Sequence, residues 1–381
     1  MSVFQTPSVI ARETLMLLKS ETQIASMVYR DYETEFTGAK IGDTVGIRAP
    51  ATYKVQDFTG ETTEQATNEG KVELKLTNHF DLTIPITAKE LTLELNDFSA
   101  QILQGVAVAW AERLDQFVFE AYKDIYNFIG TAGSPADTLA KVTDIDRIMN
   151  QLRIPMRDRA AFVDPLAKAK LMQIEAFHRA DARGDGGSAL ARARMGTLMN
   201  LDWYMAQNVV RHTSGTQAAT AGMTVNGTVS KGGTSVVIAG AQNNATFKKG
   251  DIFTIAGVTL DANTTTLAMF VVTADATASG GGAVTLSFYP ALPMDATSGV
   301  AVTGVASHSV GIAFVKQAIA LAVVPLEKPM GTDKATTMSS EGFGVRVVQG
   351  YDTKTKKDTI SFDALAGIKV IDPRLAVRLL G

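Results

Sequence analysis

The sequence predicts an α+β protein with an inserted all-β segment, and three observations support this prediction. Apolar residues recur at helical spacing in the first 30 residues and again from Asn96 to Phe128. Between these stretches, residues 36–95 alternate with the period of two that is typical of strands. The composition changes abruptly near Thr213 and changes back near His308, which indicates an insertion.

The composition is that of a folded protein of nearly balanced charge. The 381 residues include 36 Lys+Arg and 39 Asp+Glu, so the formal net charge is −3. A protein that binds nucleic acid through bulk charge normally has a basic excess, so this class is disfavoured. The absence of Cys excludes disulfides, thiolate nucleophiles and cysteine metal sites. Hydrophobic residues make up 46% of the chain and charged residues 20%, which favours a globular fold.

The sequence predicts neither a secretion signal nor a membrane span. The first residues lack a basic region followed by an apolar run and a small-residue cleavage site. The most apolar stretch, Val310–Leu326, is interrupted by Lys316 and Gln317 and is shorter than the roughly 20 residues that a span needs. We therefore expect the protein to be made and kept in a cytoplasm, with no membrane partner.

The first part of the chain, residues 1–35, is expected to form a helical arm. Thr6 is the expected N-cap of its first helix, and Pro7 is the expected first helical residue. Both residue types are favoured at these positions, because the cap side chain accepts a backbone N–H and proline has no N–H to leave unpaired.

Residues 36–95 are expected to form an extended β-hairpin. Its second arm would run through Val72–Leu76 and on through Leu82–Ile86, and its tip, Gly60–Gly70, is polar. An isolated two-stranded ribbon is only marginally stable in water, so we expect a neighbouring subunit to provide its partner.

Residues 96–212 are expected to hold the first part of an α+β core. The elements predicted there are a long helix over Asn96–Phe128, a helix over Thr143–Ile154, a strand over Ala160–Val163, a helix from Asp164 to about Phe177, and a basic loop over Arg179–Arg194.

Residues 213–308 are expected to form an inserted all-β domain, because few of them are charged and short alternating runs are separated by turn residues. The predicted strands are Met223–Val225, Ser235–Ile238, Asp251–Ile255, Met269–Val272 and Val284–Phe288. Such spacing is typical of a small immunoglobulin-like sandwich or of a barrel.

Residues 309–381 are expected to complete the core. The predicted elements are a helix over Ile312–Val324 ended by Pro325, a hairpin of Gly344–Tyr351 with Thr359–Asp363, and apolar strands at Ile368–Ile371 and Ala376–Leu380.

No pattern in the sequence predicts an active site. The four histidines, His79, His178, His212 and His308, do not have zinc-binding spacing, and His212 and His308 flank the insertion as markers of its two linkers. A phosphate-binding loop and a G-x-S-x-G elbow are absent from the sequence. We therefore predict no catalytic, cofactor-binding or metal-binding residue, no cofactor, and a protein that is not an enzyme.

Several weaker patterns favour ordinary surface roles over chemistry. The acidic pairs Asp144/Asp146 and Glu33/Glu35 are expected to be solvated rather than to act as acid and base. The glycines Gly184, Gly186 and Gly187 do not follow a strand, and Arg183-Gly184-Asp185 matches an adhesion tripeptide by chance. The arginines Arg179, Arg183, Arg192 and Arg194 could contact phosphates, but a solvated loop is favoured. The lysines Lys354, Lys356 and Lys357 favour solubility over binding of an acidic partner.

The order of these parts resembles the major capsid proteins of tailed bacteriophages, which share the HK97 fold. Met195–Val210 (MGTLMNLDWYMAQNVV) resembles the passage before the axial domain of that fold, and Ala313–Glu327 (AFVKQAIALAVVPLE) resembles its axial-domain helix. Gly342–Gly381 is similar to its closing hairpin and strands. Within the insertion, Phe247–Val258 (FKKGDIFTIAGV) resembles the inserted β-domain of P22-like coat proteins.

The resemblance implies an HK97-type fold with a helical arm, an extended hairpin loop, a long spine helix, and peripheral and axial domains. It implies a structural protein whose hexamers and pentamers close into an icosahedral head around double-stranded DNA. Assembly would begin as a scaffolded procapsid that expands on maturation. The implied partners are other copies of the chain, a scaffolding protein, a portal, and packaged DNA through weak non-specific contact. The implied location is the virion, assembled in the host bacterial cytoplasm.

Two other classes stay open at the level of sequence. The Thr- and Gly-rich insertion would also suit a surface adhesin or binding module with an immunoglobulin-like domain. Another phage structural protein, such as a tail protein, is a near neighbour, although it would lack the helical arm and the long helix.

Overall fold

A computed structural model gives the fold of residues 7–31, 44–48, 71–87, 102–178, 195–217, 222–261, 264–331, 334–352 and 357–381. The chain forms two compact units. The first combines Met1–Val118 with Ile319–Asp372, and the second combines Phe119–Ala318 with Pro373–Gly381.

The first unit is built on a five-stranded antiparallel sheet. The strands follow the order β18–β21–β20–β19, and β3 pairs with the opposite edge of β21. Their bounds are β3 Asn78–Thr87, β18 Ile319–Val324, β19 Ala335–Ser340, β20 Phe343–Asp352 and β21 Lys357–Val370. The β20–β21 hairpin confirms the pairing that the sequence predicts for Gly344–Tyr351 with Thr359–Asp363.

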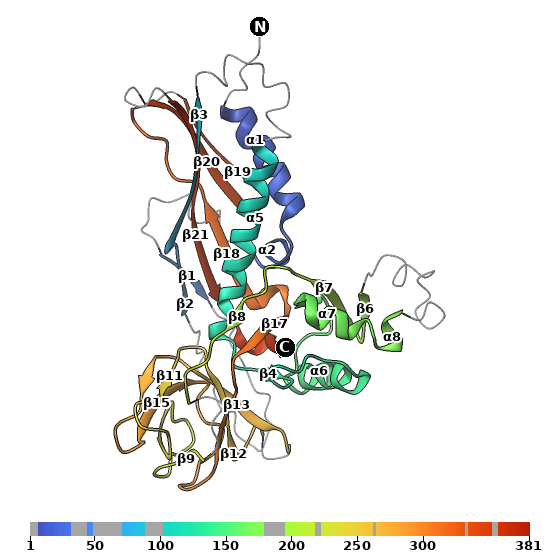
Figure 1. Ribbon diagram of the computed structural model, residues 1–381, viewed down its shortest axis with the longest axis vertical. Helices are drawn as coiled ribbons and strands as arrows, with labels where there is room; N and C mark the ends of the chain where they lie inside the picture. The colour runs from blue at the N-terminus through green and yellow to red at the C-terminus, as the bar shows by residue number, and fades with distance from the viewer. Residues whose placement is uncertain are drawn as a thin grey trace, which may run out of the picture. The chain divides into compact units, whose positions relative to one another are not determined.

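Helices α1 (Pro7–Glu21), α2 (Ile24–Met27) and α5 (Gln104–Phe119) belong mainly to this unit. Figure 1 shows α1 and α5 lying along one face of the sheet. On α5, the buried side chains Val106, Trp110, Leu114 and Phe117 recur every three or four residues, so they share one face. Phe80 of β3 meets Trp110 and Phe117 edge-on, with ring centroids 6.2 and 5.4 Å away.

The extended hairpin is only partly as predicted. β1 (Thr44–Arg48) and β2 (Lys71–Lys75) pair antiparallel, with Thr44 opposite Lys75. The ribbon packs closely against β21 at Gly367. A Cβ atom at this position would lie 2.3 Å from the carbonyl oxygen of Lys75, so only glycine fits there. The prediction that the second arm continues through Leu82–Ile86 is wrong, because these residues form β3 and pair with β21 of the same chain. The tip, Gly60–Gly70, lies outside the described residues.

The second unit contains a lobe and a barrel. The lobe has a seven-stranded sheet in the order β4–β22–β17–β5–β7–β6, with β8 paired to β17. Its strands are β4 Phe128–Ile129, β5 Arg159–Val163, β6 Gly196–Leu198, β7 Leu201–Met205, β8 Arg211–His212, β17 His308–Val315 and β22 Ala376–Leu380. Its helices are α6 Leu139–Gln151, α7 Pro165–Leu171 and α8 Glu175–His178, with the 3₁₀ turns η2 Glu120–Asp124, η3 Lys316–Ala318 and η4 Pro373–Leu375.

Local sequence accounts for the start of each helix that covers the lobe sheet. Asp164 caps α7 as predicted: its side chain accepts a hydrogen bond of 2.9 Å from the Ala167 N–H, and Pro165 follows it. Thr138 caps α6, so this helix begins earlier than the predicted Thr143. Among the described residues, no helix is long and apolar enough to cross a membrane.

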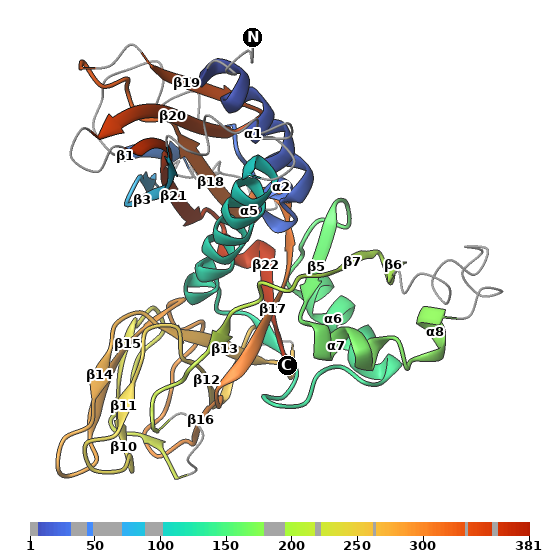
Figure 2. The same cartoon turned by 45° about the horizontal axis from the view of Figure 1, so that its top comes forward.

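The barrel lies inside the range predicted as an insertion, and Figure 2 shows it in yellow to orange. Six antiparallel strands follow the order β16–β12–β13–β15–β10–β9. The sheet nearly closes, because Thr224 bridges Ala301 and the Val225 N–H donates to the Val300 carbonyl. The bounds are β9 Thr224–Val225, β10 Ser235–Ala239, β12 Ile252–Thr259, β13 Leu267–Val272, β15 Val284–Tyr289 and β16 Val302–Gly304, beside a small sheet of β11 Thr246–Phe247 and β14 Ala276–Thr277.

Of the two architectures that the sequence leaves open for this segment, the structure has the barrel. All five predicted strands are present, whereas the sequence missed β11, β14 and β16, which are only two or three residues long. Runs this short show no clear alternation.

The predicted helix over Ile312–Val324 is wrong, and so is the resemblance of Ala313–Glu327 to a helix. The segment forms β17, the turn η3 and β18. Every residue of β18 is buried, and so are all but one of β17. A strand buried on both faces has no polar alternation, so its apolar run cannot be told from a helix by periodicity alone.

The predicted helix over Asn96–Phe128 is too long at its C-terminal end. α5 ends at Phe119, the chain continues as η2, and Phe128 already lies in β4. The apolar stripe continues because Tyr122 and Ile125 are buried in the second unit, not because the helix continues. Residues 96–101 lie outside the described residues.

A buried carboxylate joins the helical arm to α5. Asp115 on α5 is 3% exposed and accepts hydrogen bonds from the N–H groups of Gln23 (3.1 Å) and Ala25 (3.0 Å). These groups lie at the start of α2, where helical N–H groups lack a partner within the helix. Burial raises the pKa of Asp115, and the backbone hydrogen bonds oppose that increase.

We expect Asp115→Ala to lower the free energy of unfolding by about 2–3 kcal/mol, because two buried N–H groups lose their acceptor. Urea denaturation of the variant and the parent measures the difference. Glu112→Ala is the matched control, since Glu112 lies on the exposed face of the same helix; it should change stability by less than about 0.5 kcal/mol. Equal effects of the two substitutions would contradict this role for Asp115.

Candidate functional site

Five buried polar side chains meet where the barrel joins the lobe. This junction cluster consists of Tyr122, His212, Asp251, His308 and Arg378, and none of the five is more than 3% exposed. They come from η2, β8, the turn before β12, β17 and β22. His212 and His308 lie directly opposite each other in the β8–β17 pair, at the two points where the chain enters and leaves the barrel segment.

Three of these side chains form a hydrogen-bonded chain. The Tyr122 hydroxyl lies 2.8 Å from Nδ1 of His212, and Nε2 of the same ring lies 2.8 Å from Oδ1 of Asp251. The Asp251 carboxylate also accepts the N–H groups of Gly215 (3.1 Å) and Lys248 (2.8 Å). Because the carboxylate only accepts, Nε2 of His212 carries the proton and Nδ1 accepts from Tyr122. The carboxylate therefore joins the barrel turn to β8 and to the segment after it.

Arg378 supplies a positive charge that no water reaches. It is 0% exposed, and it donates from Nε to the Ile125 carbonyl (2.7 Å) and from Nη1 to the Gly250 carbonyl (2.8 Å). Its guanidinium carbon lies 5.0 Å from the centre of the Tyr122 ring, a cation–π contact. Burial lowers the pKa of Arg378 to about 9, and the nearby Tyr122 and Asp251 oppose this shift. The group is therefore still charged at neutral pH.

His308 is a neutral ring beside that charge. Its Nδ1 lies 2.7 Å from the Ala306 carbonyl, so Nδ1 carries the proton. Its ring centroid lies 5.4 Å from that of His212. Burial, together with the nearby Arg378 and His212, lowers the pKa of His308 to about 4, while the hydrogen bond to Ala306 and the Asp251 carboxylate oppose this shift.

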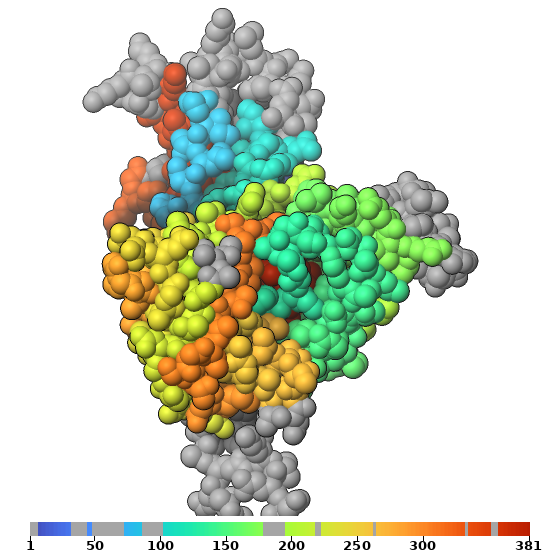
Figure 3. Space-filling view, turned by 60° about the horizontal axis from the view of Figure 1, so that its bottom comes forward, coloured from blue at the N-terminus to red at the C-terminus, as the bar shows by residue number. Residues whose placement is uncertain are grey.

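The barrel and the lobe also share apolar core around these groups. Ile252, Met269 and Val271 of the barrel strands belong to the same buried cluster as Trp203 and Leu379 of the lobe. Figure 3 shows the face on which the barrel lies beside the teal and green segments of the lobe. The junction therefore combines an apolar contact with a fixed set of charges, an arrangement suited to holding the barrel in one position.

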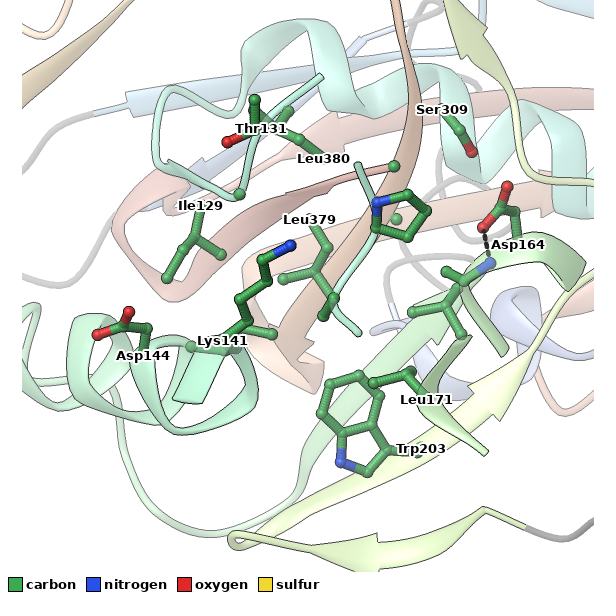
Figure 4. A pocket seen from close by; sticks show the side chains of 18 residues that line it. Ile129, Thr131, Lys141, Asp144, Asp164, Leu171, Trp203, Ser309, Leu379 and Leu380 are labelled. Atoms are coloured by element: carbon green, nitrogen blue, oxygen red, sulfur yellow. Dashed lines mark hydrogen bonds between the residues drawn. The ribbon is translucent and has the colours of Figure 1, made fainter. Parts of the chain in front are cut away.

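A pocket of about 230 Å³ lies elsewhere in the lobe, between α6, α7 and β22. Trp203, Leu171 and Leu379 form part of its apolar wall (Figure 4). The polar groups at its rim are already engaged: Lys141 pairs with Asp137 at 2.9 Å and donates to Ser134, and Asp164 caps α7. The hydrogen bond from Lys141 lowers the pKa of Asp137.

The structure gives ordinary roles to the acidic pair that the sequence analysis considered. Asp144 pairs with Arg147 at 2.9 Å, and Asp146 pairs with the buried Arg159 at 3.0 Å. Among the described residues, no group of three His, Asp or Glu side chains could hold a metal ion. His79 is half-exposed in the first unit, and Lys357 begins β21. The remaining candidates, namely Glu33, Glu35, the segment 179–194 with its arginines and glycines, Lys354 and Lys356, lie outside the described residues.

Sequence patterns alone do not predict the junction cluster, since His212 and His308 are expected only to mark the two linkers of the insertion. The available signals were these two histidines and Arg378, a single charged residue within an apolar strand. Neither signal indicates Tyr122 or Asp251.

No protein-family model and no curated protein matches the sequence. Among solved structures, the chain is similar to one named for Mycobacterium phage Che8, with 14% identity and a TM-score of 0.52 over 94% of this chain and 90% of that chain. Weaker likenesses include the capsid of Ralstonia phage GP4 (10% identity, TM-score 0.46, covering 90% and 84%) and that of Cyanophage P-SCSP1u (11%, 0.44, 89% and 84%). Of these three, the first supports an argument, and it concerns the fold alone: the chain shares its α+β fold with the Mycobacterium phage Che8 structure.

We expect Asp251→Asn to lower the free energy of unfolding by about 3–5 kcal/mol. The introduced amide would have one acceptor oxygen for the three donors that now bind the carboxylate, so its NH₂ group would face a donor. The substitution also removes the negative charge near Arg378. Urea denaturation monitored by circular dichroism measures the change. Asp158→Asn, at an exposed position of the lobe, is the matched control and should be nearly neutral. A loss below about 1 kcal/mol for Asp251→Asn would show that the cluster does not stabilise the junction.

Proposed function

We propose that the chain is a major capsid protein that self-assembles into the icosahedral head of a tailed phage. The observation that carries this proposal is the fold shared with the Mycobacterium phage Che8 structure over nearly the whole length of both chains. The sequence resemblance to HK97-fold coat proteins points to the same function, and it rests on Met195–Val210, Phe247–Val258 and Gly342–Gly381 but not on Ala313–Glu327, which is not a helix.

The physical character of the chain agrees with shell assembly. Its net charge is only −3, so many copies can approach each other without strong mutual repulsion. The sequence between the paired strands β1 and β2 is polar over Gly60–Gly70, as expected for a segment that would reach a neighbouring subunit. A shell also needs only weak, sequence-independent contact with DNA, so a basic excess is not required.

The finer assignments belong to this proposal too. We place the chain in the P22-like subgroup, because the barrel interrupts the lobe between β8 and β17, in the order that the sequence resemblance gives for the inserted domain. The five domain ranges 1–35, 36–95, 96–212, 213–308 and 309–381 are retained on the same basis. The partners would be other copies in hexamers and pentamers, a scaffolding protein, a portal, and double-stranded DNA. The location would be the virion, after assembly in the bacterial cytoplasm through a procapsid that expands.

We expect the chain, produced with the proteins encoded beside its gene, to sediment as large particles that negative-stain microscopy shows as closed shells. A scaffolding protein among those neighbours would provide the curvature that the chain alone lacks, so sheets of hexamers are expected when the chain is produced by itself. A small monodisperse species under both conditions would contradict the capsid proposal and favour an adhesin or binding module.

We expect deletion of Gly60–Gly70 to prevent shell closure while leaving the subunit folded, because the hairpin tip would contact a neighbour and not its own core. Sedimentation measures closure, and circular dichroism measures folding. A second variant replaces the same residues by a Gly/Ser segment of equal length. It keeps the length of the segment but removes its side chains, so it shows which of the two shell closure requires. Normal shells from the deletion variant would count against a role for the hairpin in assembly.

A further inference from the structure

The junction cluster controls both connections between the barrel and the lobe. β8 and β17 are the strands that lead into and out of the barrel segment, and their pairing consists of His212 opposite His308 and Arg211 opposite Ser309. On the barrel side, Asp251 and the Gly250 carbonyl bind His212 and Arg378, respectively. Any change of charge at the paired rings therefore acts at the place where the barrel is attached.

The two imidazoles differ in how they can accept a proton. Both nitrogens of the His212 ring are engaged, Nε2 with the Asp251 carboxylate and Nδ1 with the Tyr122 hydroxyl. His308 donates from Nδ1 to Ala306, and its Nε2 has no hydrogen-bond partner among the described residues. A proton added there would create a second buried cation beside Arg378.

The surroundings do not offset that second charge. The titratable groups facing His308 are Arg378 from β22, His212 from β8 and Asp251 from the barrel turn, with Tyr122 of η2 behind His212. Asp251 already accepts three donors. Further out, Asp124 is paired with Lys249 at 3.6 Å, and Glu120 acts on Tyr122.

We propose that the paired imidazoles form an acid-operated latch: proton uptake by His308 separates β8 from β17 and opens the junction, while the barrel and the lobe keep their own cores. The apolar contact of Ile252, Met269 and Val271 with the lobe opposes this opening and limits how far the barrel moves. The latch is a property of the single chain and does not depend on the proposed capsid function.

The direction of the pH effect follows from the two states of the ring. In the closed junction the pKa of His308 is about 4, and in an open, hydrated junction it returns to its usual value near 6.5. The open state therefore binds more protons between these values, so acidification favours opening. Between about pH 7.5 and about pH 5 the ratio of open to closed junctions should increase about 30-fold.

Hydrogen exchange of the whole chain, corrected for the intrinsic effect of pH, tests the latch. The amides of Ser214 and Val310 report on the junction, since they join its two connecting segments by donating to the Ser307 hydroxyl and the Val210 carbonyl. The amides of Ala278 and Phe288, which donate within the barrel, are the internal reference. We expect the junction amides to lose about 30-fold in protection between these pH values, while the reference amides change less than about threefold.

Two variants identify the titrating group. His308→Asn keeps a donor for the Ala306 carbonyl but cannot be protonated, so its junction protection should not depend on pH. His79→Asn, at a half-exposed position in the first unit, should behave like the parent chain. If His308→Asn does not fold, the parent chain alone still tests the latch. Uptake of one proton per opening event means that the logarithm of the junction protection factor falls by about one per pH unit between about pH 6 and about pH 5. A slope of zero, pH dependence that persists in His308→Asn, or equal loss at the reference amides would overturn the latch.

Discussion

The second unit depends on one constraint, the burial of a guanidinium without access to water. A charge in such a place is tolerated only if fixed dipoles and counter-charges surround it. Arg378 takes these from three separate parts of the chain: the Ile125 carbonyl after η2, the Gly250 carbonyl of the barrel turn, and the face of Tyr122. All three partners must be in place to offset the burial of this charge. The positions of the barrel turn and of the segment after η2 are therefore set by the same residue.

The first unit uses the opposite charge in a comparable way. Asp115 is a buried carboxylate on a long helix, and its partners are backbone N–H groups at the start of the four-residue helix α2, just after the turn that ends α1. Arg378 is a buried cation on a regular strand, and two of its partners are backbone carbonyls outside regular elements. In both units, a charge carried by a rigid element fixes where an irregular part of the chain lies. Apolar contacts alone would position such a part less precisely, because they are not directional.

The sequence predicted strands with alternating burial, helices with a cap, and also the buried strands β5 and β22, which are only five residues long. The strands β10 and β15 have alternating burial, and α7 begins at an Asp-Pro pair, so both kinds of element were found. The strands β17 and β18 were mistaken for a helix, because nearly all of their residues are buried and no polar face shows the period. The junction cluster could not be predicted, because the hydrogen bonds between its members join residues 39 and 90 positions apart, and Arg378 binds carbonyls 128 and 253 positions away. Only the topology of the sheet brings His212 and His308 together.

The place of β22 in its sheet has a consequence for the newly made chain. This strand spans Ala376–Leu380, lies between β4 and β17, and carries Arg378. Until residues 376–380 have been synthesised, the sheet of the lobe has an open slot between β4 and β17, and the cation at the junction is missing. Domains generally fold as units, so the second unit reaches its final form only after this strand has left the ribosome. β4 is synthesised early, but it therefore has no partner in this sheet until the barrel segment and the strands β18 to β21 of the first unit have also been made.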